Sequence, residues 1–220
     1  MSKQHRETIT CPACGARSET TFWASINNKL NPNEANELLY GNLFEFTCPS
    51  CGGSTELCYP CLFHDMERHA MIQYAPDATQ AEKTAADLDK LFERGPLQDM
   101  VDEAGYRYRI VFNHNDLREK ARIFHDGLDD RAIEVIKLMV ETMALEGPDD
   151  DTPLLVYYDR LEGNDSLRFI ILAEEVMLST VPLSMYESLL PLPGGMSNRE
   201  YFVDRDWALE HYRSVIAGKC

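Results

Sequence analysis

The strongest signal for the fold lies in two six-residue stretches, Thr10-Cys11-Pro12-Ala13-Cys14-Gly15 and Thr47-Cys48-Pro49-Ser50-Cys51-Gly52. Both have the pattern T-C-P-x-C-G. Two thiolates separated by two residues can bind one ion from a single tight turn, and two such turns complete a tetrahedral site of four sulfurs. Soft sulfur ligands in a tetrahedron favour zinc, with iron as the second choice. The sequence therefore predicts one structural zinc site, with four thiolate ligands: Cys11, Cys14, Cys48 and Cys51.

The other residues of the two motifs suit a metal-binding turn. The proline sets φ for the turn, and the glycine after the second cysteine supplies the permissive backbone that such turns need. Backbone N–H groups in the turn can then point at the sulfurs and stabilise the thiolate form.

Two other interpretations of these cysteines stay open at this point. Thirty-three residues separate Cys14 from Cys48, more than the ~15–20 of a minimal zinc ribbon, so the four thiols could instead be unrelated and buried. They could also form two disulfides, but disulfides need an oxidising compartment. Residues 1–30 contain no apolar signal region, because Lys3, His5 and Glu7 interrupt its start. We therefore expect a cytoplasmic protein with reduced thiols.

Charge and cysteine content divide the chain of 220 residues near Pro76. Residues 1–76 carry six of the seven cysteines and a net charge of −3, whereas residues 77–220 carry a net charge of −13. The predicted fold class is α+β. A β-rich, zinc-ribbon-like domain over residues 1–76 precedes an acidic, mixed α+β domain over residues 77–220.

The charge also argues against two classes of partner. A net charge of −16 opposes the counterion release that drives nucleic-acid binding, and it repels anionic membrane surfaces. The longest apolar runs, such as residues 169–173, are far shorter than the ~20 residues that span a bilayer. We therefore expect a protein partner, no nucleic acid and no membrane; the oligomeric state does not follow from the sequence.

A third pair, Cys58 and Cys61, has a different context. It lies in residues 55–63, which have strand composition, and residues three apart on a strand point to opposite faces. Buried core thiols are the favoured interpretation. A second metal centre with His64 and His69, or a redox pair that oxidises to a disulfide, stays open. Cys220 is expected to be incidental.

The two motifs resemble those of the bacterial CpXC domain proteins, a family named for its paired Cys-Pro-x-Cys motifs. The resemblance extends to about residue 145, through residues 38–44, 59–65, 72–76, 117–124 and 127–131. It implies zinc at the four motif cysteines, and it implies no reaction.

Hydrophobic periodicity and turn residues predict the other elements. We expect helices over residues 33–39, 79–94, 116–127, 130–145, 184–190 and 204–215, the fourth capped by Asp129 or Asp130. Strands are expected over residues 18–27, 55–63 and 106–112, with a hairpin over 154–161 and 167–173 and an edge strand over 176–181.

No enzyme class has a positive signal in this sequence. It contains no glycine-rich phosphate loop, no G-x-S-x-G elbow and no H-E-x-x-H motif. The leading hypothesis is therefore a non-catalytic interaction or regulatory module held together by zinc. The alternatives are an enzyme of unknown class with its site in the second domain, near His114, His125 and Asp126, and a thiol redox switch at Cys58 and Cys61.

Overall fold

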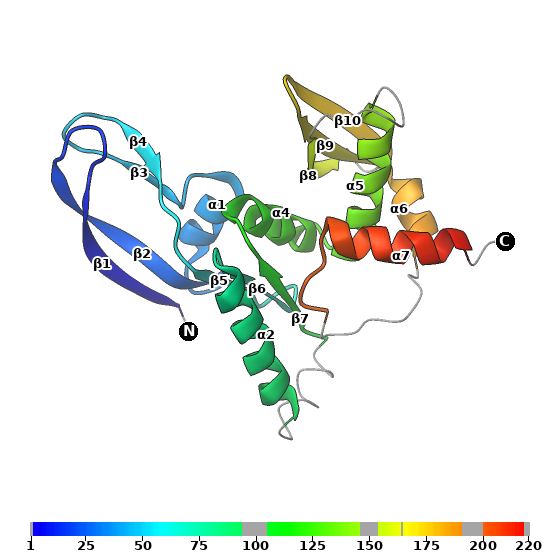
Figure 1. The fold of residues 1–220 in the computed structure, drawn as a ribbon, viewed down its shortest axis with the longest axis horizontal. Helices are drawn as coiled ribbons and strands as arrows, with labels where there is room; N and C mark the ends of the chain where they lie inside the picture. The colour runs from blue at the N-terminus through cyan, green and yellow to red at the C-terminus, as the bar shows by residue number, and fades with distance from the viewer. Residues whose placement is uncertain (1, 94–104, 146–153, 164, 191–199, 218–220) are drawn as a thin grey trace. The chain divides into compact units, whose positions relative to one another are not determined.

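The computed structural model describes residues 2–93, 105–145, 154–163, 165–190 and 200–217 (Figure 1). The fold is mixed α+β, as the sequence predicts. Its contacts divide the chain into two compact units, Met1–Ala121 and Arg122–Cys220. The domain boundary near Pro76, which marks the change in composition, stays a prediction.

The first unit is built on a five-stranded sheet with the strand order β1-β2-β5-β6-β7. β1 pairs with β2 and β5 with β6 in antiparallel fashion, whereas the β2–β5 and β6–β7 pairs are parallel. The strands are β1 Lys3–Thr10, β2 Arg17–Asn27, β5 Cys61–Asp65, β6 Ala70–Tyr74 and β7 Arg107–Val111.

The β1–β2 hairpin projects from this sheet as an arm. Only the last three residues of β2, Ser25 to Asn27, pair with β5, so the rest of β2 pairs with β1 alone. A second, shorter hairpin consists of β3 (Glu45–Thr47) and β4 (Ser54–Glu56). The long segment between the two cysteine pairs therefore contains all of β2, a helix and β3 (Figure 1).

The predicted strand over residues 55–63 is wrong in one respect, because the structure divides it. β4 ends at Glu56 and β5 begins at Cys61, with Cys58 and Tyr59 between the two strands. Pro60 has no N–H to donate to a sheet ladder, and proline is confined to strand ends and edges for that reason. The interruption moves Cys58 out of regular structure and leaves Cys61 as the first residue of a buried strand.

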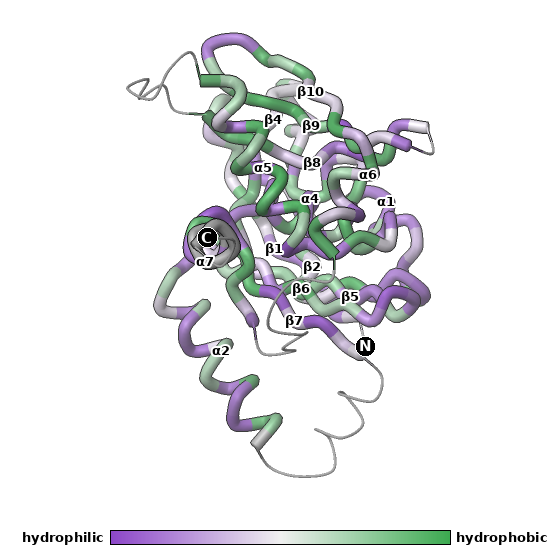
Figure 2. The backbone as a smooth tube through the Cα atoms, turned by 90° about the vertical axis from the view of Figure 1, so that its right-hand side faces the viewer, coloured by the Kyte–Doolittle hydropathy of each residue, from purple (hydrophilic) through white to green (hydrophobic). Residues whose placement is uncertain are grey.

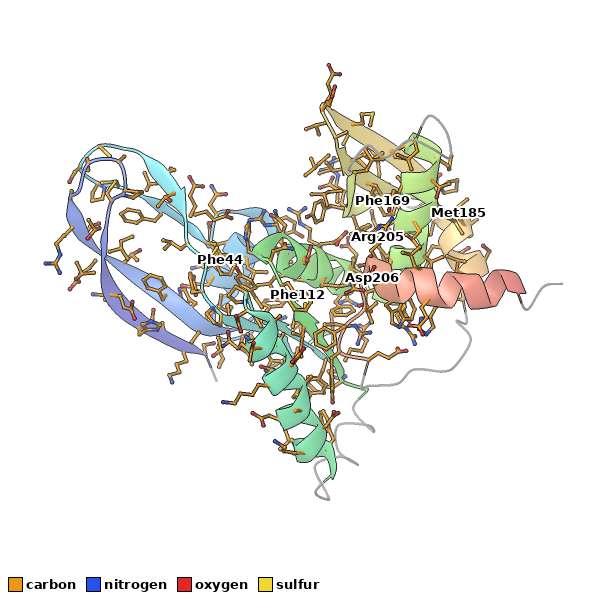
Figure 3. The ribbon with its side chains drawn as sticks, viewed as in Figure 1. Phe44, Phe112, Phe169, Met185, Arg205 and Asp206 are labelled. Carbon is orange, nitrogen blue, oxygen red and sulfur yellow. The ribbon has the colours of Figure 1, made fainter. Side chains whose placement is uncertain are left out.

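Three helices pack in the first unit: α1 Pro32–Tyr40, α2 Ala78–Glu93 and α4 His114–His125, the last of which crosses into the second unit. Arg118 of α4 donates hydrogen bonds to the carbonyl oxygens of Leu38 and Gly41 at the end of α1, at 3.3 and 3.1 Å. Phe44, labelled in Figure 3, packs its ring against those of Tyr59 and Tyr74. These contacts fix the base of the β3–β4 hairpin.

The second unit combines a three-stranded antiparallel sheet, ordered β10-β9-β8, with helices α5, α6 and α7. Its core helix α5 begins at the predicted position, where the side chain of Asp129 accepts a hydrogen bond from the N–H of Arg131. Arg205 of α7, labelled in Figure 3, pairs with Glu141 of α5. The bounds are α5 Asp130–Ala144, β8 Leu155–Glu162, β9 Ser166–Leu172, β10 Val176–Pro182, α6 Leu183–Leu189 and α7 Arg205–Ala217.

Candidate metal centre

Each cysteine motif forms the turn at the tip of a hairpin. The first motif joins β1 to β2, and the second joins β3 to β4. In Figure 1 the two tips, dark blue and cyan, lie side by side at the far end of the arm. Four cysteines from two distant stretches of sequence therefore meet in one place, as the motif repeat predicts.

The backbone of the two turns is the same. In each, the N–H of the first cysteine donates to the carbonyl five residues later, and the N–H of the glycine four residues later donates back to the carbonyl of that cysteine. All four of these distances are 2.9 Å. Gly15 and Gly52 have φ of +73° and +72°, the left-handed region that glycine enters at little cost. The repeated glycine is thus required by the backbone of the turn.

The four sulfur atoms form one compact group. All of them lie within 4.8 Å of one another. The Cys11 and Cys51 sulfurs are 3.8 Å apart, and those of Cys14 and Cys48 are 3.7 Å apart. A tetrahedron with metal–sulfur bonds of ~2.3 Å has sulfur–sulfur edges of about 3.8 Å, so the two short distances match that geometry. This group of cysteines could hold a metal ion.

Packing supports the cluster from one side only. Cys11 and Cys48 are buried, whereas Cys14 and Cys51 are exposed. Phe46 of β3 completes a small core with the two buried cysteines. Three partly buried apolar side chains pack against this core: Ile9, Ala16 and Leu57. The first cysteine of each motif is therefore anchored in the protein, and the second faces solvent.

Electrostatics in the cluster also suit a cation. The backbone N–H groups of Cys51 and Ser50 lower the pKa of the Cys48 thiol to about 6, so this sulfur is largely thiolate at neutral pH. For Cys14, the N–H of Ala16 lowers the pKa, but the thiols of the other cysteines and burial outweigh it and raise the pKa to about 12. Because the sulfurs are so close, a negative charge on one thiolate disfavours ionisation of the neighbouring thiols. A bound cation would offset the repulsion between the thiolates.

The third cysteine pair does not join a comparable group. Within the described residues, the four motif cysteines make up the one cluster of cysteine, histidine and acidic side chains close enough to hold a metal. Cys58 is exposed and Cys61 is buried, and both are free thiols. Burial raises the pKa of Cys61 to about 12, which keeps it protonated and inert, as expected for a core thiol. Cys220 lies outside the described residues.

His64 is committed to a different role. The amide of Asn27 is oriented by the backbone N–H groups of Lys29 and Leu30, which donate to its Oδ1. Its Nδ2 therefore faces Nδ1 of His64, at 3.2 Å, and Nε2 of His64 lies 2.9 Å from the Tyr106 hydroxyl. Both ring nitrogens are thus occupied by hydrogen bonds.

The possible second metal centre would need His64 and His69 as ligands, and both rings make other contacts. Burial, and then the positive N-terminus, lower the pKa of His64. The ring of His69 stacks on Tyr106, with centroids 5.1 Å apart. Within the described residues, no cluster close enough to hold a metal combines either histidine with the third cysteine pair.

The residues named for an alternative enzyme site are also not brought together. His114 and His125 are the first and last residues of the 12-residue helix α4, which places them roughly 16 Å apart along its axis. His125 is exposed, and Asp126 accepts a hydrogen bond from the Tyr158 hydroxyl at 2.6 Å.

One polar cavity, of about 310 Å³, does contain His114. In it His114 Nε2 pairs with the carboxylate of Glu56, and Arg118 lies nearby. Burial lowers the pKa of His114, although Glu56 acts in the opposite direction. Sequence reasoning missed the partner Glu56, because the pairing joins β4 to α4 across more than fifty residues and no local pattern signals it.

The structure is thus that of a protein in which two cysteine turns, on separate hairpins, form one four-sulfur cluster. A family model described as CpXC protein matches residues 9–137, which include both turns and more than half of the chain. The chain belongs to the CpXC family. No curated protein and no solved structure matches it significantly. Among the described helices, none has the length and apolar character that crossing a membrane requires.

Proposed function

We propose that Cys11, Cys14, Cys48 and Cys51 bind one zinc ion with a structural role. The observation that carries this proposal is the pair of sulfur–sulfur distances, 3.8 and 3.7 Å, which match the edges of a four-sulfur tetrahedron around zinc. Four thiolates favour zinc over harder cations. With all four positions occupied by sulfur, no position is left for a reactive water, so the ion supports structure rather than catalysis.

The two hairpins need such a cross-link. β3 and β4 have three residues each, and an isolated two-stranded hairpin is marginally stable at best in water. Among the described residues, the apolar cluster at the tips contains one large buried side chain, that of Phe46, besides the two cysteines. Structural zinc contributes ~10–16 kcal/mol of apparent binding free energy in small peptides, which is ample to hold the tips together.

The wider role that fits this chain is that of a cytoplasmic interaction or regulatory module. The six described cysteines are free thiols, as expected where glutathione keeps thiols reduced. The net charge of −16 favours a protein partner over nucleic acid or an anionic membrane. Residues 122–220 carry −10 of this charge, which makes the second unit the region that would attract a basic partner.

Metal analysis of three purified proteins tests the zinc proposal. We expect one zinc per chain in the natural protein and in Cys58→Ser, whose side chain is exposed and outside the cluster. Cys48→Ser removes a buried ligand and should lose the metal, with unfolding or aggregation of the first unit. Full metal content and unchanged melting of Cys48→Ser, or no metal in the natural protein, would contradict the proposal.

A further inference from the structure

The three-stranded sheet of the second unit presents an apolar outer face. Val156, Tyr158, Phe169 and Ile171 are buried on its inner face. The residues that alternate with them form two neighbouring rows across the strands, because Leu155 and Val176 both pair with Leu172, and Tyr157 and Leu178 both pair with Ile170. We call these six residues the outer patch: Leu155, Tyr157, Ile170, Leu172, Val176 and Leu178.

The outer patch is largely open to solvent at its ends. Leu155, Val176 and Leu178 are 58%, 69% and 64% exposed. Figure 2 shows the strongly hydrophobic character of β9 and of the start of β10. A contiguous apolar patch on a folded chain marks an interaction surface far more often than a scattered exposed side chain does.

The two edges of this sheet differ in their protection. β8 carries three charged residues, Asp159, Arg160 and Glu162, and contacts α5. β10 carries no charged residue from Val176 to Pro182, and among the described residues β9 is its one strand neighbour. Edge strands of soluble proteins are normally blocked by charge, proline or a covering element. Within the described residues, α6 also contacts β10, but no strand pairs with its outer edge, so this edge is open to strand pairing beside an exposed apolar face.

The charged residues around β10 indicate which kind of molecule could bind beside this strand. Residues 169–190 contain no Lys or Arg, and their three acidic residues, Glu174, Glu175 and Glu187, are all exposed. The neighbouring cation, Arg168, lies in register with Thr180 of β10 and forms ion pairs with Asp159 and Glu162. A second copy of this chain would bring the same acidic residues to the same edge, which like-charge repulsion opposes. In addition, a patch of six side chains presents on the order of a few hundred Å², less than the ~800 Å² that each partner of a stable dimer buries.

We propose that β10 is a docking strand, to which an extended basic segment of a partner protein adds as a fourth strand of the sheet. Main-chain hydrogen bonds to β10 would supply affinity, alternate apolar side chains of the segment would extend the outer patch, and its Lys or Arg residues would face the acidic residues. The inference rests on the proposed interaction role and names its surface. The surface lies outside residues 9–137, so it belongs to the part of the chain beyond the family match.

The test uses the full chain as purified and three labelled peptides of about ten residues. The first alternates Val with Lys, the second has Glu in place of each Lys, and the third has Pro in place of alternate residues, which blocks strand pairing. Fluorescence anisotropy should show binding of the Lys peptide, at least about tenfold weaker binding of the Glu peptide, and none of the Pro peptide.

Variants locate the binding site. Leu178→Lys puts a charge in the middle of the β10 edge and should weaken binding of the Lys peptide at least about tenfold. Met143→Lys, at an 81% exposed position of α5, adds the same charge elsewhere and should leave binding unchanged. Circular dichroism and metal content confirm that both variants fold, and Val176→Lys replaces Leu178→Lys if the latter does not.

Three results would overturn the inference. The first is equal binding of all three peptides, and the second is equal binding of the Lys peptide by Leu178→Lys and Met143→Lys. The third is no binding of the Lys peptide by a chain with its full metal content, a result that leaves the proposed zinc site intact. Sedimentation showing a dimer that Leu178→Lys dissociates would instead identify a second copy as the occupant and reject the basic segment. Absence of zinc from the natural chain would count against the proposed function alone.

Discussion

Replacement of Gly52 by alanine isolates the energetic contribution of the left-handed turn. Gly52 has φ of +72°, and its N–H donates to the Cys48 carbonyl at 2.9 Å. Alanine keeps that N–H, and its Cβ would meet no atom within 4 Å. The cost is therefore confined to the left-handed backbone, about 1–2 kcal/mol for a residue with a Cβ.

This cost should appear as weaker metal binding, since the turn must hold its shape to present both sulfurs. One to two kcal/mol corresponds to roughly 5- to 30-fold in an equilibrium constant. We expect Gly52→Ala to weaken metal retention by that factor in a chelator competition assay. Gly15→Ala should behave alike, because Gly15 has φ of +73° and the same open surroundings.

Gly53→Ala is the matched control. An added Cβ there would lie 3.4 Å from the Cys51 sulfur and 3.8 Å from Ala13 Cβ, at the distances of ordinary van der Waals contact, and its φ lies outside the left-handed region. Metal retention should change little. Gly52→Asn should recover part of the loss, because asparagine tolerates this conformation better than alanine. Equal losses of metal retention in Gly52→Ala and Gly53→Ala, or no loss in Gly52→Ala, would contradict the assigned role of the left-handed turn.

Two further predictions concern side chains outside the cluster. Burial lowers the pKa of His64 below its ordinary 6.5. As the pH falls, His64 of the unfolded chain is therefore protonated before His64 of the folded chain. The contribution of neutral His64 to the unfolding free energy is complete above about pH 6.5 and is lost as the pH falls towards the folded pKa. His64→Gln should therefore show a smaller fall in unfolding free energy between about pH 7 and pH 5 by urea denaturation, and an identical fall would contradict this role. In a Cys220→Ser background at neutral pH, maleimide should modify exposed Cys58 and spare Cys61, whose pKa is about 12; rapid modification of Cys61 detected by mass spectrometry would show that its site opens to solvent.

Most of the regular structure follows from local patterns. The apolar spacing in residues 130–145 predicts α5, and the capping aspartate predicts where it begins. The turn and alternation over residues 154–173 predict the β8–β9 hairpin. These elements are predictable because their signals lie within one or two turns of chain.

The strands that local patterns miss are stabilised by pairing with a neighbouring strand of the same chain. β1 has the sequence Lys-Gln-His-Arg-Glu-Thr-Ile-Thr and is exposed along nearly its whole length. It has no alternation of apolar and polar residues, and it becomes a strand by pairing with β2. The division of residues 55–63 likewise depends on where β4 pairs with β3 and where β5 pairs with β6.

The four cysteines that cluster, and the form of each turn, follow from the sequence alone. Six consecutive residues contain the two cysteines, the proline and the left-handed glycine that a metal-binding turn requires, so the chemistry of each half-site is local. The family resemblance follows from the same residues and is confirmed over residues 9–137.

How the two halves of the site combine depends on tertiary packing. Cys14 and Cys48 are separated by thirty-three residues, and their sulfurs come within 3.7 Å because two hairpins pack at their tips around Phe46. Elsewhere in the first unit, tertiary packing buries Cys61, leaves Cys58 exposed and places a hydrogen-bond partner at each ring nitrogen of His64. Backbone geometry acts within a few residues, whereas the burial of a side chain depends on which distant surfaces meet, and that is why the third cysteine pair could not be interpreted until the fold was known.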